Sequence, residues 1–305
     1  MLWIFILFVV IVGNIYYYFF RNIVFITKNN HIHFNQQLIS FETNMKQRYP
    51  LTPTSTFRIT HGKVYADFFM RMGQMLIIAY MHNNTVIGTA CGVWRKIYVS
   101  DQMRYHNIIY ICDLKVLPNF RRQGISTSLY YAGMLAYVCF VRKAYALIMK
   151  PTYSTLEDVP SYRFALKLGF SFHGWINIYK VDQKTLKTIL LDLLKWKGGY
   201  IFTDISASKN LIEISSAGTE SILPIWHMHF SKQSHNLNDK NIRDTHHVMS
   251  KDPKTQYMFC FHEKDPITTM LVNHRIKPWT HAGLIQRGMD EWQPSSFDFI
   301  QTSEI

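Results

Sequence analysis

A short basic turn, from Arg121 to Thr127, has the composition of an anion-binding site. It follows a run of β-branched and aromatic residues from Ile108 to Val116, which is typical of a buried strand, and Pro118 ends that strand. Apolar residues at helical spacing begin directly after the turn and continue to Val141. The predicted order is therefore strand, turn and helix.

The chemistry of this turn depends on the start of the helix. The first backbone N–H groups of a helix have no intrahelical partner and lie at the positive end of its dipole. Gly124 lets an anion approach the backbone, and Arg121 and Arg122 add fixed positive charge. Ser126 and Thr127 offer hydroxyl groups for capping. The pattern predicts a phosphate site, although a solvated basic helix start explains the spacing alone equally well.

The same residues resemble motif A of the GNAT superfamily, the acyl-CoA-dependent N-acyltransferases. That motif is a hydrophobic strand ending in V-x-P, followed by Q/R-x-x-G-x-G/A, and the chain has Val116-Leu-Pro118 and then Arg121-x-x-Gly124-x-Ser126. Ser126 stands where the family has Gly or Ala. A predicted strand at 144–149 and a helix ending in Lys-Leu-Gly-Phe170 follow, as in the family. The resemblance covers roughly residues 57–182.

The resemblance implies acetyl-CoA, or another acyl-CoA, as the co-substrate, and an amine of a protein or small molecule as the acceptor. The implied cofactor-binding residues are Leu114, Val116, Arg121, Arg122, Gln123, Gly124, Ile125, Ser126 and Thr127. In the family, a backbone N–H of the central strand polarises the thioester carbonyl, and that group maps to Val116 or its neighbours.

Three side chains are candidates for the acid and base of the transfer. The family often has a tyrosine where this chain has Ala165, so Tyr162, one helical turn earlier, and Tyr153 are the predicted substitutes. A family base often lies where this chain has Tyr110. Asp113 is the nearby carboxylate, and carboxylates are uncommon in strands, so it is the third candidate. Buried tyrosines and an ion-paired surface aspartate are the alternatives.

Composition limits the class of protein. The chain has 305 residues, a net charge of +13 and 48% hydrophobic residues, which allow a sizeable core and exclude general disorder. The charge favours acidic partners, but no run of five basic residues occurs, so no specific nucleic acid is predicted. The four cysteines stand singly in apolar stretches, as buried reduced thiols do. Histidine pairs such as His227-x-His229 lack the spacing of a zinc site, and no metal is predicted.

Residues 1–21 are predicted to form a single-pass transmembrane anchor. The segment from Met1 to Phe20 has no charged side chain and is long enough to span a bilayer. It lacks the basic n-region of a cleaved signal peptide, and its last residues are aromatic, as in an interfacial belt. Arg21 and Lys28 follow it, so the positive-inside rule places the catalytic domain on the cytoplasmic side.

The rest of the chain is predicted to be α/β. A polar tether over 22–55 leads into a GNAT-like domain over 56–182, a mixed sheet flanked by helices. Two of its strands, Gln74–Tyr80 and Thr85–Val99, are joined at Asn83-Asn84, because Asn tolerates the left-handed conformation of hairpin turns.

Residues 183–305 are predicted to form a C-terminal α+β domain that begins with a helix over 183–196. A helix is expected near 222–230, and a hairpin over 256–274. Because this hairpin resembles the earlier pair of strands, the region is alternatively a degenerate second GNAT-like half without motif A.

The sequence thus predicts a membrane-anchored N-acyltransferase that moves an acetyl group from acetyl-CoA to a primary amine by direct attack. Two alternatives remain open. One is a two-half enzyme for a longer acyl chain, similar to the N-myristoyltransferases. The other is a catalytically silent membrane scaffold that retains the fold.

Overall fold

The computed structural model describes residues 20–45, 48–52, 55–137, 142–149, 155–197, 201–204, 210–223, 225–230, 243–244, 252, 254–300 and 302. The predicted anchor therefore lies almost entirely outside the described residues. Within the described ranges, no helix is long and apolar enough to cross a bilayer.

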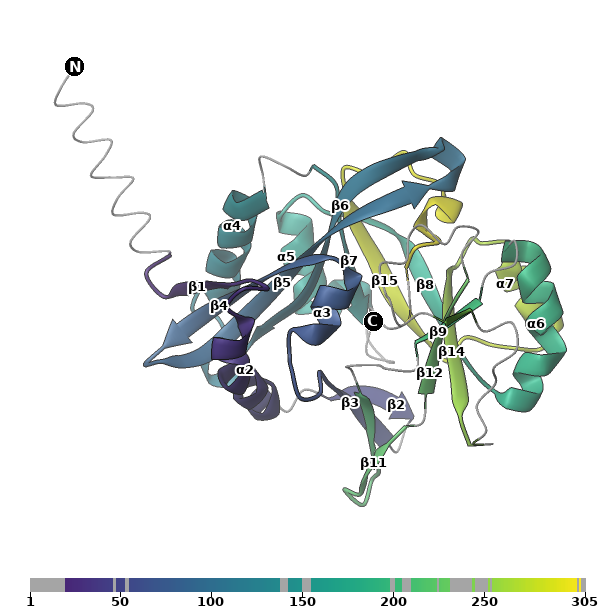
Figure 1. Ribbon diagram of the computed structural model, residues 1–305, viewed down its shortest axis with the longest axis horizontal. Helices are drawn as coiled ribbons and strands as arrows, with labels where there is room; N and C mark the ends of the chain where they lie inside the picture. Colours follow the sequence, from purple (N-terminus) through teal and green to yellow (C-terminus); the bar gives the residue numbers. More distant parts are fainter. Residues whose placement is uncertain are drawn as a thin grey trace.

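An eleven-stranded mixed sheet spans the molecule (Figure 1), with the strand order β1-β4-β5-β6-β7-β15-β8-β14-β12-β9-β13. The strands in this order are Ile23–Ile26, Gln74–His82, Thr85–Val99, Arg104–Val116, Ala144–Met149, Thr280–Arg287, Ser171–Asp182, Gln256–His262, Ile225–Phe230, Ile201–Asp204 and Arg243–Asp244. A second sheet has the order β11-β10-β3-β2, with bounds Glu220–Ile222, Asn210–Ile214, Ser55–Thr60 and Tyr49–Thr52.

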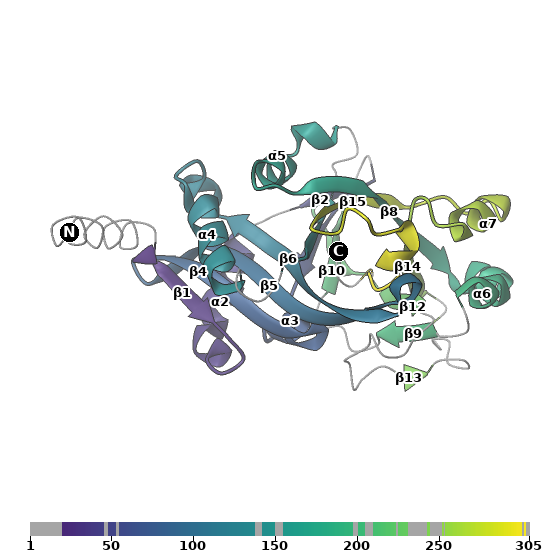
Figure 2. The ribbon, with the colours of Figure 1, turned by 90° about the horizontal axis from the view of Figure 1, so that it is seen from above.

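Helices cover both faces of the large sheet. Leu38 of α2 (His31–Met45) and Phe69 of α3 (Asp67–Met72) pack on one face of β4 to β6. On the other face, α4 (Ile125–Tyr137) buries Leu129 against β4 and β5, and α5 (Pro160–Lys167) packs beside β7. The helices α6 (Gln183–Lys197) and α7 (Ile267–Asn273) lie at the opposite end of the molecule from α2 and α4 (Figure 2).

The large sheet contains the same strand–helix–strand unit twice. In β7-α5-β8 and again in β14-α7-β15, two strands flank a short helix, and β6 and β12 pair in parallel with the first strand of their unit. The last strands are exchanged: β15 pairs with β7 and β8 pairs with β14, while β15 and β8 pair with each other in the middle. That the C-terminal region is a degenerate second GNAT-like half stays a prediction.

Several predicted elements are confirmed. The Asn83-Asn84 turn joins β4 and β5, and both asparagines are left-handed, with φ of 47° and 59°. The strands at 108–116 and 144–149 and the helix at 183–196 are present.

Three predictions are wrong. The tether over 22–55 instead contains β1, α2 and β2, because Leu38, Phe41 and Met45 form a helical stripe that is buried in the main core. The helix near 222–230 is strand β12, which runs inside the large sheet. The second arm of the hairpin over 256–274 is helix α7, whose Ile267 and Leu271 pack on the sheet.

Candidate functional site

The basic turn lies in the open at the start of α4. Arg121 to Gly124 are exposed, and the first helical hydrogen bond runs from Ser128 N–H to Gly124 O at 3.0 Å. Gly124 has φ of 78°, and a Cβ built there would meet nothing within 4 Å, so the space beside its backbone is free. The amides that open α4 therefore face a space that an anion can enter.

The predicted cofactor residues divide into exposed and buried members. Arg122, like Gly124, is left-handed, with φ of 64°, and Gln123 Nε2 donates to Asn119 O at 3.4 Å. Ser126 and Thr127 are half-buried in the first turn of α4. The side chain of Ile125 is buried in the core under α4, so only its backbone can serve a ligand.

The backbone of Val116 faces away from β5. Leu117 N–H donates to Ile87 O at 2.9 Å, and neighbouring residues of a strand direct their backbone groups to opposite edges. Consistent with this, Val116 O accepts a hydrogen bond from Arg121 Nε at 3.2 Å. The side chains of Leu114 and Val116 pack under α4. The edge of β6 that faces away from β5 therefore leads directly to the basic turn.

This edge opens because β6 and β7 diverge. Their parallel pairing joins only Ile109 to Ala144 and Tyr110 to Tyr145 within the described ranges. Beyond these pairs, β7 continues with β15 as its partner, from Ala146–Ile285 to Met149–Ala282. The end of β6 thus has β5 on one side and a splayed edge on the other.

Asp113 lies at this end of β6 but is not free. Its carboxylate forms an ion pair with Lys115 and accepts a hydrogen bond from the Tyr65 hydroxyl. Burial raises the pKa of Asp113, but the positive charge of Lys115, the proximity of His61 and these hydrogen bonds outweigh it, so that the net pKa is lowered. An anion with a low pKa and occupied oxygens is a poor general base.

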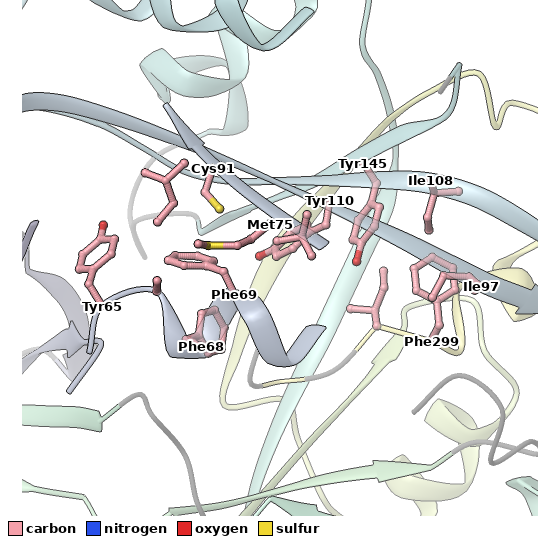
Figure 3. Packing of buried hydrophobic residues seen from close by; sticks show 14 of the residues in the cluster. Tyr65, Phe68, Phe69, Met75, Cys91, Ile97, Ile108, Tyr110, Tyr145 and Phe299 are labelled. Carbon is pink, nitrogen blue, oxygen red and sulfur yellow. The ribbon is translucent and has the colours of Figure 1, made fainter. Parts of the chain in front are cut away.

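The tyrosine candidates lie in different surroundings. Tyr162 is 7% exposed and packs edge-on against Phe172, and burial raises the pKa of its phenol. Its surroundings are those of a core side chain, as are those of Ala165. Tyr153 lies outside the described residues. Tyr110 stacks on Tyr145 with ring centroids 4.9 Å apart (Figure 3).

Sequence reasoning missed the partners of Asp113. Tyr65 and His61 come from the segment before α3, and Glu42, which bonds His61, comes from the supposed tether. No local motif marks them, but the helical stripe that contains Leu38 and Phe41 would have revealed α2.

Metal-binding and thiol chemistry are not prominent. Among the residues that the structure describes, no group of three His, Cys, Asp or Glu side chains could hold a metal ion. Cys91, Cys112 and Cys260 are free thiols, and Cys91 and Cys112 are directly opposite each other on β5 and β6.

Part of the chain is similar to known proteins. Residues 42–170 match the model of the Acetyltransferase (GNAT) family. An uncharacterized protein of Acanthamoeba polyphaga mimivirus is 24% identical over 251 residues, which is 79% of this chain and 68% of that protein.

Similar solved structures include a tandem GNAT protein from the clavulanic acid biosynthesis pathway. It is 10% identical, with a TM-score of 0.47, over 87% of this chain and 98% of its own. Arabidopsis thaliana NAA60 in complex with acetyl-CoA is 16% identical, with a TM-score of 0.35, over 51% of this chain and 88% of its own. The match to the acetyltransferase (GNAT) family model covers residues 42–170, which is less than half of this chain.

Proposed function

We propose that the protein is an acyl-CoA-dependent N-acyltransferase whose co-substrate binds along the free edge of β6. The observation that carries this proposal is the continuity of two features. The outward-facing backbone of Val116 leads, through the Arg121–Val116 hydrogen bond, to the exposed amides and guanidinium groups at the start of α4.

Each part of acyl-CoA has a complementary surface there. The pyrophosphate fits the amides of Gly124 to Thr127 and the charges of Arg121 and Arg122, since helix starts and arginines both favour phosphate. The extended pantetheine arm, which contains amides, can pair with the edge of β6 as a strand would. Its thioester carbonyl then lies against the backbone N–H of Val116 or Leu114, a donor for the oxyanion.

The proposed reaction is direct attack by the amine on the thioester carbonyl. The amine nitrogen forms a bond to the carbonyl carbon, the tetrahedral oxyanion collapses, and the carbon–sulfur bond breaks. The amine proton goes to solvent or a base, and the CoA thiolate takes a proton. Asp113 and Tyr162 are not assigned these proton transfers because of their buried, engaged positions.

The exchanged repeat favours the two-half form of this function. The unit β14-α7-β15 repeats β7-α5-β8, and β12 and β14 also separate after three pairs, from Ile225–Gln256 to His227–Met258. Thr302 lies where they separate and bonds to His227 Nδ1 at 3.0 Å and to Met258 O at 3.3 Å. We therefore propose one acyl-CoA per chain, bound by the first half.

The test is binding followed by turnover. Isothermal titration of the full chain with acetyl-CoA and myristoyl-CoA should give one site per chain, and the tighter ligand reports the acyl length. Release of the CoA thiol is then measured with peptides, lysine, amino sugars and polyamines as acceptors. Binding without turnover on all of them would favour the silent scaffold, and the absence of binding would refute the proposal.

Membrane attachment through residues 1–21, with the catalytic domain on the cytoplasmic side, is proposed from the sequence. It is supported by the uncharged apolar composition of the segment and by Arg21 and Lys28 after it. Flotation of the full chain with liposomes, compared with a chain lacking residues 1–19, tests it. Equal flotation of the two chains would contradict it.

A further inference from the structure

A buried network of ionisable side chains surrounds β6 just before Val116. The Tyr65 side chain is fully buried, and its hydroxyl donates to Asp113, whose carboxylate is 7% exposed. Lys115, 14% exposed, forms an ion pair with the same carboxylate. Burial raises the pKa of Tyr65, and the charge of Asp113 raises it further, so the phenol keeps its proton and donates.

Asp113 also lies in an unusual backbone conformation. It has φ of 54°, in the left-handed region, and the pairing of β5 with β6 shifts register between Thr89 and Cys91 at this point. This register shift is a bulge, which turns the strand and redirects the backbone beyond it. Thr89 Oγ1 donates to Asp113 O at 3.1 Å, so both the backbone carbonyl and the carboxylate of Asp113 are hydrogen-bonded.

A second layer supports Tyr65. His61 lies with its ring centroid 4.7 Å from that of Tyr65, and Glu42 of α2 accepts hydrogen bonds from His61, including one from its backbone N–H at 3.0 Å. The backbone N–H of Tyr65 donates to Asn35 Oδ1 of α2 at 2.9 Å. In Figure 3, Tyr65 extends from the segment before α3, with its hydroxyl toward the strands.

A buried ion pair is weak evidence of a stabilising role, because apolar residues of similar volume often give the same free energy of unfolding. A bulge held from three sides beside a binding edge has another use. It fixes the direction of the backbone groups that follow it, and these include the Val116 amide. Pre-aligned donors contribute more to catalysis than donors that must reorient.

We propose that Tyr65, Asp113 and Lys115 are positioning residues that hold the β6 bulge so that the Val116 edge is aligned for acyl transfer. His61 and Glu42 hold Tyr65 in turn. This inference rests on the proposed function and deepens it, since it assigns Asp113 to the alignment of the strand and not to proton transfer.

The central test is Tyr65→Phe, which removes only the hydroxyl that bonds Asp113. We expect kcat to fall by roughly 10-fold to 100-fold, because small misalignments of reacting groups have effects of that order. The Kd for acyl-CoA should change less than about threefold, since the phosphate contacts are intact. Tyr179→Phe is the matched control and should leave kcat unchanged, because Tyr179 is a buried tyrosine of β8 that stacks on Phe259 of β14.

Two substitutions at Asp113 separate alignment from proton transfer. Asn tolerates the left-handed conformation and can still accept from Tyr65, whereas Ala can do neither well. Asp113→Asn should therefore retain most of kcat, and Asp113→Ala should lose at least as much as Tyr65→Phe.

The outcomes discriminate between the two proposals. Turnover by the wild type with an unchanged kcat in Tyr65→Phe would overturn the positioning role alone. Equal loss of kcat in Asp113→Asn and Asp113→Ala would overturn it in favour of direct proton transfer. A wild type that binds no acyl-CoA would overturn the proposed function and this inference with it.

Discussion

The two strand–helix–strand units end their helices, α5 and α7, with the same cap geometry but with different residues. Each helix ends in the same capping pattern: Phe170 N–H donates to Ala165 O at 3.1 Å, and Ile276 N–H donates to Leu271 O at 2.9 Å. The left-handed residue of this cap is Gly169, with φ of 79°, in the first unit but Arg275, with φ of 59°, in the second. Glycine adopts this conformation without strain, and arginine does not.

The difference at the ligand edges is larger. Beside β6, the splayed edge leads to the basic turn, whereas beside β12 the side chain of Thr302 bridges both strands. The repeated unit therefore accounts for the strand order of the large sheet. What lies between the diverging parallel strands differs, and this difference is why the first unit, and not the second, is proposed to bind the ligand. Four experiments test this account of the two units.

The largest effect is expected from core truncations, which test whether the halves unfold together. Leu129→Ala in α4 and Leu271→Ala in α7 each remove a fully buried side chain and should lower the free energy of unfolding by about 2–5 kcal/mol. Because β15 and β8 are exchanged, calorimetry should show one shifted transition for both variants. Two separate transitions would show that the halves are independent.

A charge placed in the basic turn tests which half binds the ligand. Gly124→Asp should weaken acyl-CoA binding on the order of 100-fold, by repulsion and by occupying the free space beside the backbone. Gly218→Asp is the matched control, since Gly218 has φ of 79° and also has nothing within 4 Å of a Cβ. Titration calorimetry measures both. Full affinity in Gly124→Asp would place the ligand elsewhere.

Acidic pH should weaken the packing of Trp292 and Phe297, which follow β15, on three histidines. Trp292 packs on His106 at 5.1 Å between ring centroids, and Phe297 packs on His173 at 4.6 Å and on His262 at 6.4 Å. Burial lowers the pKa of all three histidines. The positive charges of Lys143 and Arg104 lower the pKa of His106 further. At His173, Lys264 lowers the pKa further and Asp290 raises it. At His262, the neighbouring His173 lowers the pKa further.

The lowered pKa values determine how the free energy of unfolding changes with pH. The unfolded chain, with ordinary histidines near pH 6.5, binds protons that the folded chain does not, so this stability is present above about pH 6.5 and is lost below it. The urea concentration at the unfolding midpoint should decrease as the pH is lowered from 7.5 to 5.5. The decrease should be smaller in His106→Gln. A midpoint that rises on acidification would contradict the assignment.

The smallest effect concerns the two helix caps. Arg275→Gly should raise the free energy of unfolding by about 0.5–1 kcal/mol, because it relieves the left-handed strain. Gly169→Ala should lower it by about 1 kcal/mol, although a Cβ there meets nothing within 4 Å. Changes of the same sign in both variants would show that backbone strain does not govern the caps.

The elements that sequence predicted well are those with local signals. The strand, glycine turn and helix around Gly124 and the Asn83-Asn84 turn depend on neighbouring residues, and the structure has them. The Tyr65–Asp113 contact joins residues 48 positions apart and has no local signal. Asp113 is a candidate because carboxylates are rare in strands, but its neighbours Tyr65 and His61 come from the segment before α3, which carries no motif.

The exchange of strands was equally invisible to local reasoning. The resemblance to the family ends near Asp182 and predicts a domain boundary there, with the C-terminal region as a separate unit. In the structure, β8 has β15 on one side and β14 on the other, and both come from that region. Pairing between distant strands is decided by the whole sheet, which a pattern of alternating residues does not encode.

This exchange has a consequence for synthesis on the ribosome. When β8 leaves the exit tunnel, neither of its two partners has been made, so its hydrogen-bonding edges and that of β7 await residues 256–287. Unpaired strand edges are templates for aggregation. Until residues 256–287 have been translated, we therefore expect the unpaired edges of β7 and β8 to make the newborn polypeptide prone to aggregation.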